Sequence, residues 1–152
     1  MGLDMYLNVK VYLPAYAHNG PENREKYETI LYLLSLPISS NSPVLELETN
    51  IMYWRKANQI HGWFVENCAN GVDDCKPVRV SRDKLIELLD TVVHVLKTKD
   101  TTLLQPMAGC FFGSKDIDEW YWVDLKETRD GLVNILDNEN LREHSFSYCA
   151  SW

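Results

Sequence analysis

The densest group of chemically useful side chains lies within residues 53–65 of this sequence. Five side chains stand out as candidate ligand contacts, namely Trp54, Arg55, Lys56, Asn58 and His61. Adjacent cations can hold an anion, an amide and an imidazole can give directional hydrogen bonds, and an indole can stack on a planar ring. The combination predicts a binding site for a small anionic ligand that carries a planar group.

The apolar spacing predicts a helix over residues 52–68. At about 100° per residue, Asn58 and His61 share an apolar face with Trp54. The opposite face of this predicted helix would carry Arg55, Gln59 and Glu66. Buried polar groups require hydrogen-bond partners. Two interpretations therefore stay open: a satisfied pair that links helix to sheet, or a pocket wall that contacts ligand.

The cations at the start of this predicted helix also need an explanation. A positive charge at a helix N-terminus opposes the helix dipole. Arg55 and Lys56 are therefore expected to have a tertiary partner, with Asp73, Asp74 and the carboxylates of the last helix as candidates. The alternative is that both are ordinary surface cations.

A second segment, residues 109–114, reads Gly-Cys-Phe-Phe-Gly-Ser ahead of a predicted helix. Backbone N–H groups at Gly113 and Ser114 can hold a phosphate at such a position. The segment lacks the Gly-Lys-Ser/Thr of a phosphate-binding loop. A short buried strand followed by a helix cap, at Ser114 or Asp116, explains the same residues without a ligand.

Acids and aromatics crowd residues 116–124, where Trp120 is a candidate for stacking on a base. Asp118, Glu119 and Asp124 can serve as acid/base groups or metal ligands, although acids in a first helical turn also stabilise the helix. If the protein is an enzyme, His61 with Asp118 or Glu119 would form its catalytic pair. Cys110 would be a nucleophile only if the fold placed it beside His61. No metal or cofactor is predicted.

The remaining pattern predicts an α+β fold in a single domain over residues 1–152. About four helices would pack on a small, mainly antiparallel sheet. Two-residue alternation predicts strands at 3–13, 44–51 and 144–152, with a shorter strand at 76–80. Helical spacing predicts helices at 22–36, at 52–68, from Ser81 onward, and from Ser114 or Asp116 onward.

Composition limits the classes of partner. The chain of 152 residues has a formal charge of −7, which argues against broad nucleic-acid binding because such binding needs a basic surface. No apolar run is long enough to cross a membrane. Four cysteines without a Cys-x-x-Cys pair, and an N-terminus unlike a signal peptide, predict a cytoplasmic protein with reduced thiols.

Several segments together resemble a family of small uncharacterised proteins from bacteriophages and prophages. They are Met-Gly-Leu-Asp-Met-Tyr-Leu at residues 1–7, Tyr-Trp-Arg-Lys-Ala-Asn-Gln-Ile-His with Trp-Phe-Val at 53–65, Gly-Val-Asp-Asp-Cys at 71–75, Phe-Phe-Gly-Ser at 111–114 and Asp-Glu-Trp-Tyr-Trp at 118–122. The resemblance spans most of the chain. It implies expression in the host bacterial cytoplasm, with a role in host takeover or in blocking host defence, and it transfers no catalytic residues.

Three functional hypotheses follow. The first is a phage-type accessory protein that binds a nucleotide-like ligand and sequesters a host immune signal. The second is a hydrolase or phosphodiesterase-like enzyme that acts on such a ligand with His61 as acid/base. The third is an interaction module that binds a host protein through its acidic aromatic helix around Trp120 and Trp122. Homo-oligomerisation is left open in all three.

Overall fold

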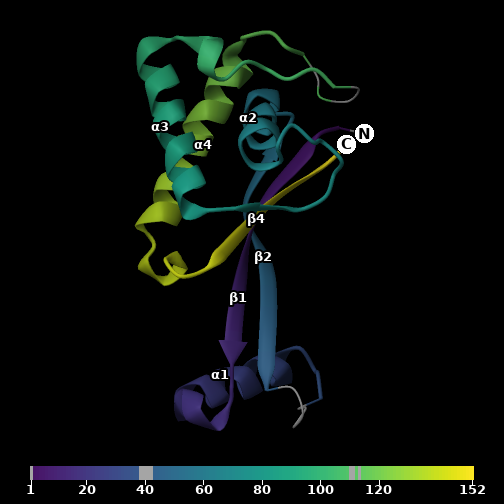
Figure 1. Cartoon of the computed structure of the whole chain (residues 1–152), viewed down its shortest axis with the longest axis vertical. Helices are drawn as coiled ribbons and strands as arrows, with labels where there is room; N and C mark the ends of the chain where they lie inside the picture. Colours follow the sequence, from purple (N-terminus) through teal and green to yellow (C-terminus); the bar gives the residue numbers. More distant parts are fainter. Residues whose placement is uncertain (1, 38–42, 110–111, 113) are drawn as a thin grey trace. The chain divides into compact units, whose positions relative to one another are not determined.

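The computed structural model describes residues 2–37, 43–109, 112 and 114–152 (Figure 1). The strands in these residues are β1 (Asp4–Pro14), β2 (Val44–Arg55), β3 (Val78–Val80) and β4 (Ser145–Ser151). The α-helices are α1 (Gly20–Leu33), α2 (Asn58–Cys68), α3 (Arg82–Thr98) and α4 (Glu119–Asp137). Short 3-10 helices lie at Ala17–Asn19, Thr101–Leu103 and Glu139–Leu141.

The four strands form one sheet in the order β2-β1-β4-β3, and the predicted α+β class is confirmed. β3 and β4 run antiparallel, with Val78 opposite Tyr148. β1 and β2 also run antiparallel. The Lys56 N–H donates to the Leu3 carbonyl near one end of the pair, and the Ala15 N–H donates to the Pro43 carbonyl near the other.

The chain forms two compact units, residues 10–49 and the larger unit of residues 1–9 with 50–152. Strands β1 and β2 contribute residues to both. In the smaller unit, Tyr27 and Leu31 of α1 pack with Ala15, and Leu13 and Leu45 complete this small cluster. The single domain predicted over residues 1–152 stays a prediction.

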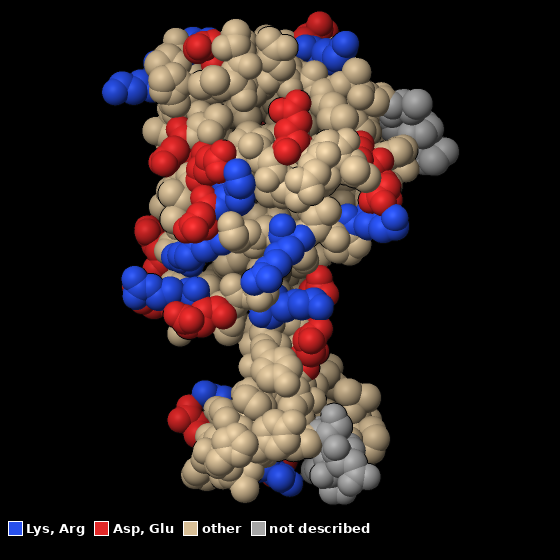
Figure 2. Space-filling view, viewed as in Figure 1, with Lys and Arg blue, Asp and Glu red and all other residues tan. Residues whose placement is uncertain are grey.

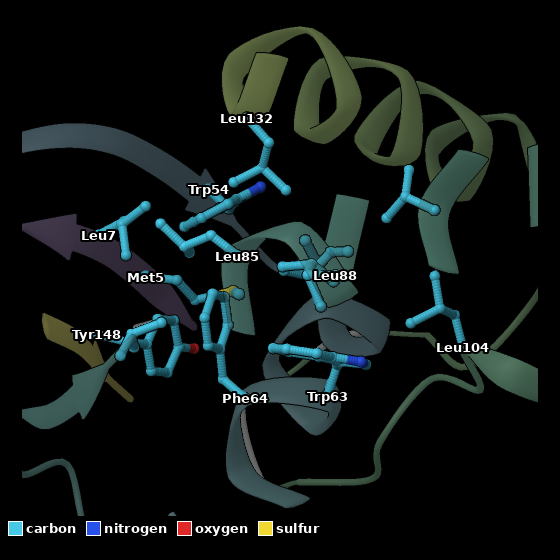
Figure 3. Close-up of a cluster of buried hydrophobic side chains, with 14 of the residues drawn as sticks. Met5, Leu7, Trp54, Trp63, Phe64, Leu85, Leu88, Leu104, Leu132 and Tyr148 are labelled. Carbon is cyan, nitrogen blue, oxygen red and sulfur yellow. The ribbon is translucent and has the colours of Figure 1, made fainter. Parts of the chain in front are cut away.

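The main core belongs to the larger unit. Alternate residues of β1 are buried, as the two-residue period predicts, and β4 buries Phe146, Tyr148 and Ala150 in the same way. Helices α2, α3 and α4 supply the other side of this core. Figure 3 shows Phe64 of α2 beside Tyr148, and their rings stack with centroids 4.0 Å apart.

The α3 boundary is the one that the sequence predicts best. Ser81 is the N-cap, and its hydroxyl accepts from the Lys84 N–H. Four apolar residues on the inner face of α3 are buried, namely Leu85, Leu88, Val92 and Val95. The helix ends where Lys99 adopts a left-handed conformation.

The predicted helix over residues 52–68 is wrong at its start. Strand β2 continues to Arg55, and α2 begins only at Asn58. Lys56 lies between them with φ of 60°, a left-handed conformation that turns the chain within two residues. Trp54 therefore belongs to the sheet and does not share a helical face with Asn58 and His61. An aromatic-rich segment satisfies both the strand and the helix period, which explains the error.

The predicted start of the last helix is also corrected. Helix α4 begins at Glu119, and its N-cap is Asp118, whose carboxylate accepts from the Tyr121 N–H at 3.1 Å. The predicted caps Ser114 and Asp116 instead bond to each other in the preceding segment. The strand predicted at 109–113 falls partly outside the described residues, since 110, 111 and 113 are not among them.

Candidate functional site

A pocket of about 390 Å³ in the larger unit brings together several of the predicted site residues. This volume lies within the usual range for small-molecule sites. The end of β2, the first turn of α2, the segment before α4 and the first turns of α4 form its walls. The lining residues are Arg55, Lys56, Gln59, Pro106, Phe112, Ser114, Asp116, Asp118, Trp120, Tyr121 and Asp124.

Two exposed cations stand at the β2 end of this pocket. The Arg55 Nε lies 3.9 Å from an Asp4 carboxylate oxygen, so the expected partners Asp73, Asp74 and the last helix are replaced by a residue of β1. Lys56 has no ion pair within the described part of the chain. Lys56 follows β2 directly and has a left-handed backbone conformation, which sets the direction of its side chain. An uncompensated cation is thus available to an anionic ligand.

Asp124 supplies the most perturbed acid of the pocket. Burial raises its pKa to about 6, and the nearby charges of Glu127 and Asp118 act in the same direction. The Gln59 side-chain amide donates to Asp124 at 3.1 Å and opposes the rise. Gln59 was expected on the polar face of its helix, but it is buried and serves this pocket instead. The carboxylate retains capacity to accept further hydrogen bonds.

The other two carboxylates are already engaged. Asp118 caps α4, as described above, and Asp116 accepts from the Ser114 hydroxyl at 2.5 Å. Each still contributes negative charge to the pocket, so the lining carries three acids against two cations. A bare polyanion would meet repulsion here. The pocket suits a ligand that combines an anionic group with hydrogen-bond donors.

Trp120 gives the pocket an aromatic surface. The residue lies in the first turn of α4 and is 66% exposed, which is unusual for tryptophan and leaves the indole available for stacking. Phe112 is buried on another wall and meets the His61 ring edge-on at 4.8 Å between centroids. Tyr121 is held by a hydrogen bond from its hydroxyl to the Leu104 carbonyl.

Asn58 lies behind the pocket wall. Its side-chain N–H donates to the Ser114 carbonyl at 2.9 Å, and its backbone carbonyl accepts from the Met107 N–H. The side-chain oxygen is buried and has no hydrogen-bond partner among the described residues. Asn58 therefore positions the segment that carries Ser114. The predicted contact Gly113 lies outside the described residues, as does Cys110.

Trp54 and Glu119 do not line the pocket. The Trp54 indole is buried in the core (Figure 3), where its N–H donates to the Thr128 hydroxyl at 2.8 Å. The Thr128 hydroxyl in turn donates to the Asp124 carbonyl. Trp54 thus supports the helix that carries Asp124 without contacting the pocket. Glu119 is exposed in the first turn of α4.

His61 belongs to a second, closed polar cluster. One ring nitrogen lies 2.7 Å from the Tyr148 hydroxyl, and the other lies 3.0 Å from an Asp73 carboxylate oxygen. The Trp152 indole donates to the same carboxylate. The adjoining cavity measures only about 20 Å³. The structure therefore pairs His61 with Asp73, whereas the enzyme hypothesis pairs it with Asp118 or Glu119.

A larger groove of about 640 Å³ runs beside α2 and shares Gln59 and Pro106 with the pocket. Its lining includes a single charged residue, Glu66, and its remaining polar residues are amides and hydroxyls. The groove offers no cation for an anionic ligand. Of these two cavities, only the smaller pocket combines cations, an exposed indole and a carboxylate.

The charge distribution on the rest of the surface is consistent with a small, local binding site. Figure 2 shows cations and carboxylates interleaved on the face in view, without a broad basic area. No group of three or more His, Cys, Asp or Glu side chains in the described residues is arranged to hold a metal ion. None of the described helices combines the length and apolarity needed to cross a membrane.

Comparisons with protein-family models, with curated proteins and with solved structures found no match to this chain. Function must therefore be argued from the pocket itself. Sequence reasoning named Arg55, Lys56, Ser114 and Trp120, which the fold gathers. The sequence also names Asp124, as a candidate acid/base group or metal ligand. Its pairing with Gln59 depends on the tertiary contact between α2 and α4, which no local pattern indicates.

Proposed function

We propose that this protein binds a small nucleotide-like ligand in the pocket between β2, α2 and α4. The observation that carries the proposal is the set of complementary groups around one cavity: the cations Arg55 and Lys56, the exposed indole of Trp120, and the partly buried acceptor Asp124. A phosphorylated nucleoside has an anion, a planar ring and a hydrogen-bonding edge. Each group of the pocket therefore has a counterpart in the ligand.

The carboxylate of Asp124 favours one class of base. A guanine ring presents two adjacent N–H donors on its Watson–Crick edge, which match a carboxylate that accepts two hydrogen bonds. Adenine presents a donor beside an acceptor, and the acceptor would face the charged carboxylate. Trp120 stacks on either ring without discriminating between them. The proposed ligand is therefore a guanine nucleotide, linear or cyclic.

Sequestration is the proposed use of this binding. The sequence resemblance implies a bacteriophage accessory protein, and such a protein can block host defence by holding a nucleotide immune signal. Catalysis by His61 has less support, because its ring nitrogens contact Tyr148 and Asp73 in the closed cluster. The exposed Trp120 is compatible with a host-protein contact as well, and co-purification from host lysate distinguishes that role.

Isothermal titration with a panel of purine and pyrimidine nucleotides, linear and cyclic, tests the proposal. We expect heat with guanine nucleotides, weaker heat with adenine nucleotides and none with inorganic phosphate. Chromatography of the recovered ligand then separates binding from turnover, since sequestration leaves it intact. The absence of heat with every member of the panel would overturn the proposal.

A further inference from the structure

Helix α1 ends in a run of large apolar side chains that face solvent. Tyr32 is 83% exposed and Leu33 is 73% exposed, and Leu34 and Leu36 are each about half exposed. Single exposed apolar residues are common, but four within five positions form a contiguous feature of the chain. Burial of Tyr27 and Leu31 on the other side of α1 completes this unit's own cluster, so the exposed run takes no part in it.

The same outward face of α1 carries a shallow hollow that extends from its first turn to Ile30. The hollow measures about 330 Å³ and is lined by Glu22, Glu25, Lys26, Thr29 and Ile30. At 3.6 residues per turn, Leu33 continues the row that contains Glu22, Lys26 and Thr29. The carbon stems of the charged side chains provide apolar floor, and their charged ends stay in water. The outward side of α1 thus has a hollow over residues 22–30, followed by projecting apolar side chains at its C-terminal end.

We propose that this face is an interface between two copies of the chain, packed with their α1 helices antiparallel. A two-fold contact requires a surface that complements itself. In the antiparallel arrangement, Leu33 and Tyr32 of each copy enter the hollow of the other. A parallel arrangement would instead place the Glu22 and Glu25 carboxylates of the two copies together.

The size of the smaller unit favours the same occupant. Residues 10–49 enclose a core of three buried apolar residues, Ala15, Tyr27 and Leu31. Units of about 40 residues usually need oligomerisation or another staple to remain folded. The four exposed side chains offer on the order of 500 Å² per copy. Used twice, this area reaches the roughly 1,000 Å² that a specific interface requires.

The charge pattern also supports a second copy. The second half of α1 and the residues up to Pro37 carry no charge after Glu28. In Figure 2 the part of the surface that carries α1 is largely neutral on the face shown. The projecting end therefore offers no charge to a strongly charged partner. In the antiparallel arrangement it meets Thr29, Ile30 and the carbon stems of the hollow in the second copy.

Analytical ultracentrifugation of the full chain over about 1 to 100 μM, the range for modest interfaces, tests this proposal. We expect the mass of two 17.6 kDa chains at the upper concentrations. Leu33→Glu removes the projecting side chain and Thr29→Arg fills the hollow. Each is expected to weaken dimerisation on the order of 100-fold. Val93→Glu, at an exposed apolar site on α3, is the matched control and should leave the dimer intact.

Circular dichroism establishes that the variants are folded. A wild-type chain that stays monomeric at 100 μM would overturn the proposal, because the α1 face would then not bind a second copy. A dimer that survives both Leu33→Glu and Thr29→Arg would also overturn it, because the interface would lie elsewhere. Two variants, one in the hollow and one at the projecting end, keep the test decisive if one of them misfolds.

Discussion

Helix α2 contributes to two polar regions of the larger unit, and they differ in how their hydrogen bonds are satisfied. Around His61, both ring nitrogens have partners within the protein, and the neighbouring cavity is too small for a ligand. Around Gln59, the side chain reaches a partly buried carboxylate beside two exposed cations and an exposed indole. The first region uses its polar groups to hold the fold together. The second leaves Lys56, the Trp120 indole and part of the accepting capacity of Asp124 available to a ligand.

Residue type alone does not identify the binding site of this protein. His61 is the side chain that chemistry would suspect first, because imidazole is a common acid/base group and ligand contact in enzyme sites. Its partners instead join α2 to β4 and to the loop that carries Asp73. Gln59 attracts little attention in the sequence, yet it lines the pocket. A cavity that is lined by a charged group without a partner indicates a binding site better than residue type does.

The largest expected effect comes from breaking the closed cluster. His61→Ala removes two hydrogen bonds and leaves a cavity, so we expect a loss of about 3 kcal/mol in unfolding free energy. This corresponds to a fall of roughly 6–12 °C in melting temperature. Thermal and urea unfolding measure it. His94→Ala on the exposed side of α3 should cost no more than about 0.5 kcal/mol. Equal losses for both histidines would contradict a structural role for His61.

Substitutions of Arg55 and Lys56 should have the next largest effect, and they should change ligand affinity and stability in opposite directions. Lys56→Gly removes a charge and also relieves the left-handed backbone, so stability should rise by roughly 0.5–1 kcal/mol. Combined with Arg55→Ala, it should weaken guanine-nucleotide binding on the order of 100-fold. Calorimetric titration and urea unfolding measure the two quantities. Arg142→Ala removes an exposed cation paired with Glu139 and serves as the control. Unchanged affinity in the double variant would remove both cations from the site.

Asp124→Asn tests the acidic wall through its pH dependence. The folded-state pKa of about 6 lies above the ordinary value of 3.8, so the folded chain binds more protons than the unfolded chain between these values. Wild-type stability should therefore fall, relative to Asp124→Asn, as pH rises from about 4 to about 6. We expect about 1 kcal/mol after allowing for partial exposure. If the unfolding free energies of the two proteins change with pH in the same way, the pKa of Asp124 is not raised in the folded chain.

The same carboxylate should control base preference. Guanine recognition requires the ionised form, so the affinity for guanine nucleotides should rise as pH increases through about 6. Asp124→Asn should reduce the preference for guanine over adenine by roughly 10-fold. Titrations of both bases at pH 5 and pH 7.5 measure the preference. A preference that is the same at both pH values would exclude this recognition mode.

The smallest effect is expected at the stacking residue. Trp120→Ala should weaken nucleotide binding by about 10-fold and leave stability within about 0.5 kcal/mol, because the indole is largely exposed. Trp120→Phe should restore part of the affinity, since a smaller ring still stacks. Intrinsic fluorescence and calorimetry follow the change. An alanine variant with wild-type affinity would show that the ring of the ligand lies elsewhere.

Much of the fold could be predicted because its patterns are local. The alternation of β1, the buried face of β4 and the Ser81 cap of α3 each depend on residues close in the chain. The change from β2 to α2 could not, because a left-handed Lys56 ends the strand within an aromatic segment that fits either period. The start of α4 was missed because Ser114 and Asp116 are equally good caps by type.

The candidate site divides in the same way. Arg55, Lys56 and Trp120 are recognisable from their types and neighbours in the sequence. The pairing of Gln59 with Asp124 spans 65 positions and exists only once α2 lies against α4. The separation of His61 from Asp118 has the same cause, because only the folded chain shows that Asp73 takes the place of the expected acid.

A ¹⁵N–¹H NMR titration with a guanine mononucleotide shows which polar region binds the nucleotide, because indole and backbone amide resonances report on both regions at once. We predict shifts in the Trp120 indole, the Gln59 side-chain amide and the amides of residues 114–118. The Trp54 indole, which donates to Thr128 in the core, should stay in place. Shifts confined to the His61 cluster and Trp152, or no shifts at millimolar nucleotide, would contradict the account.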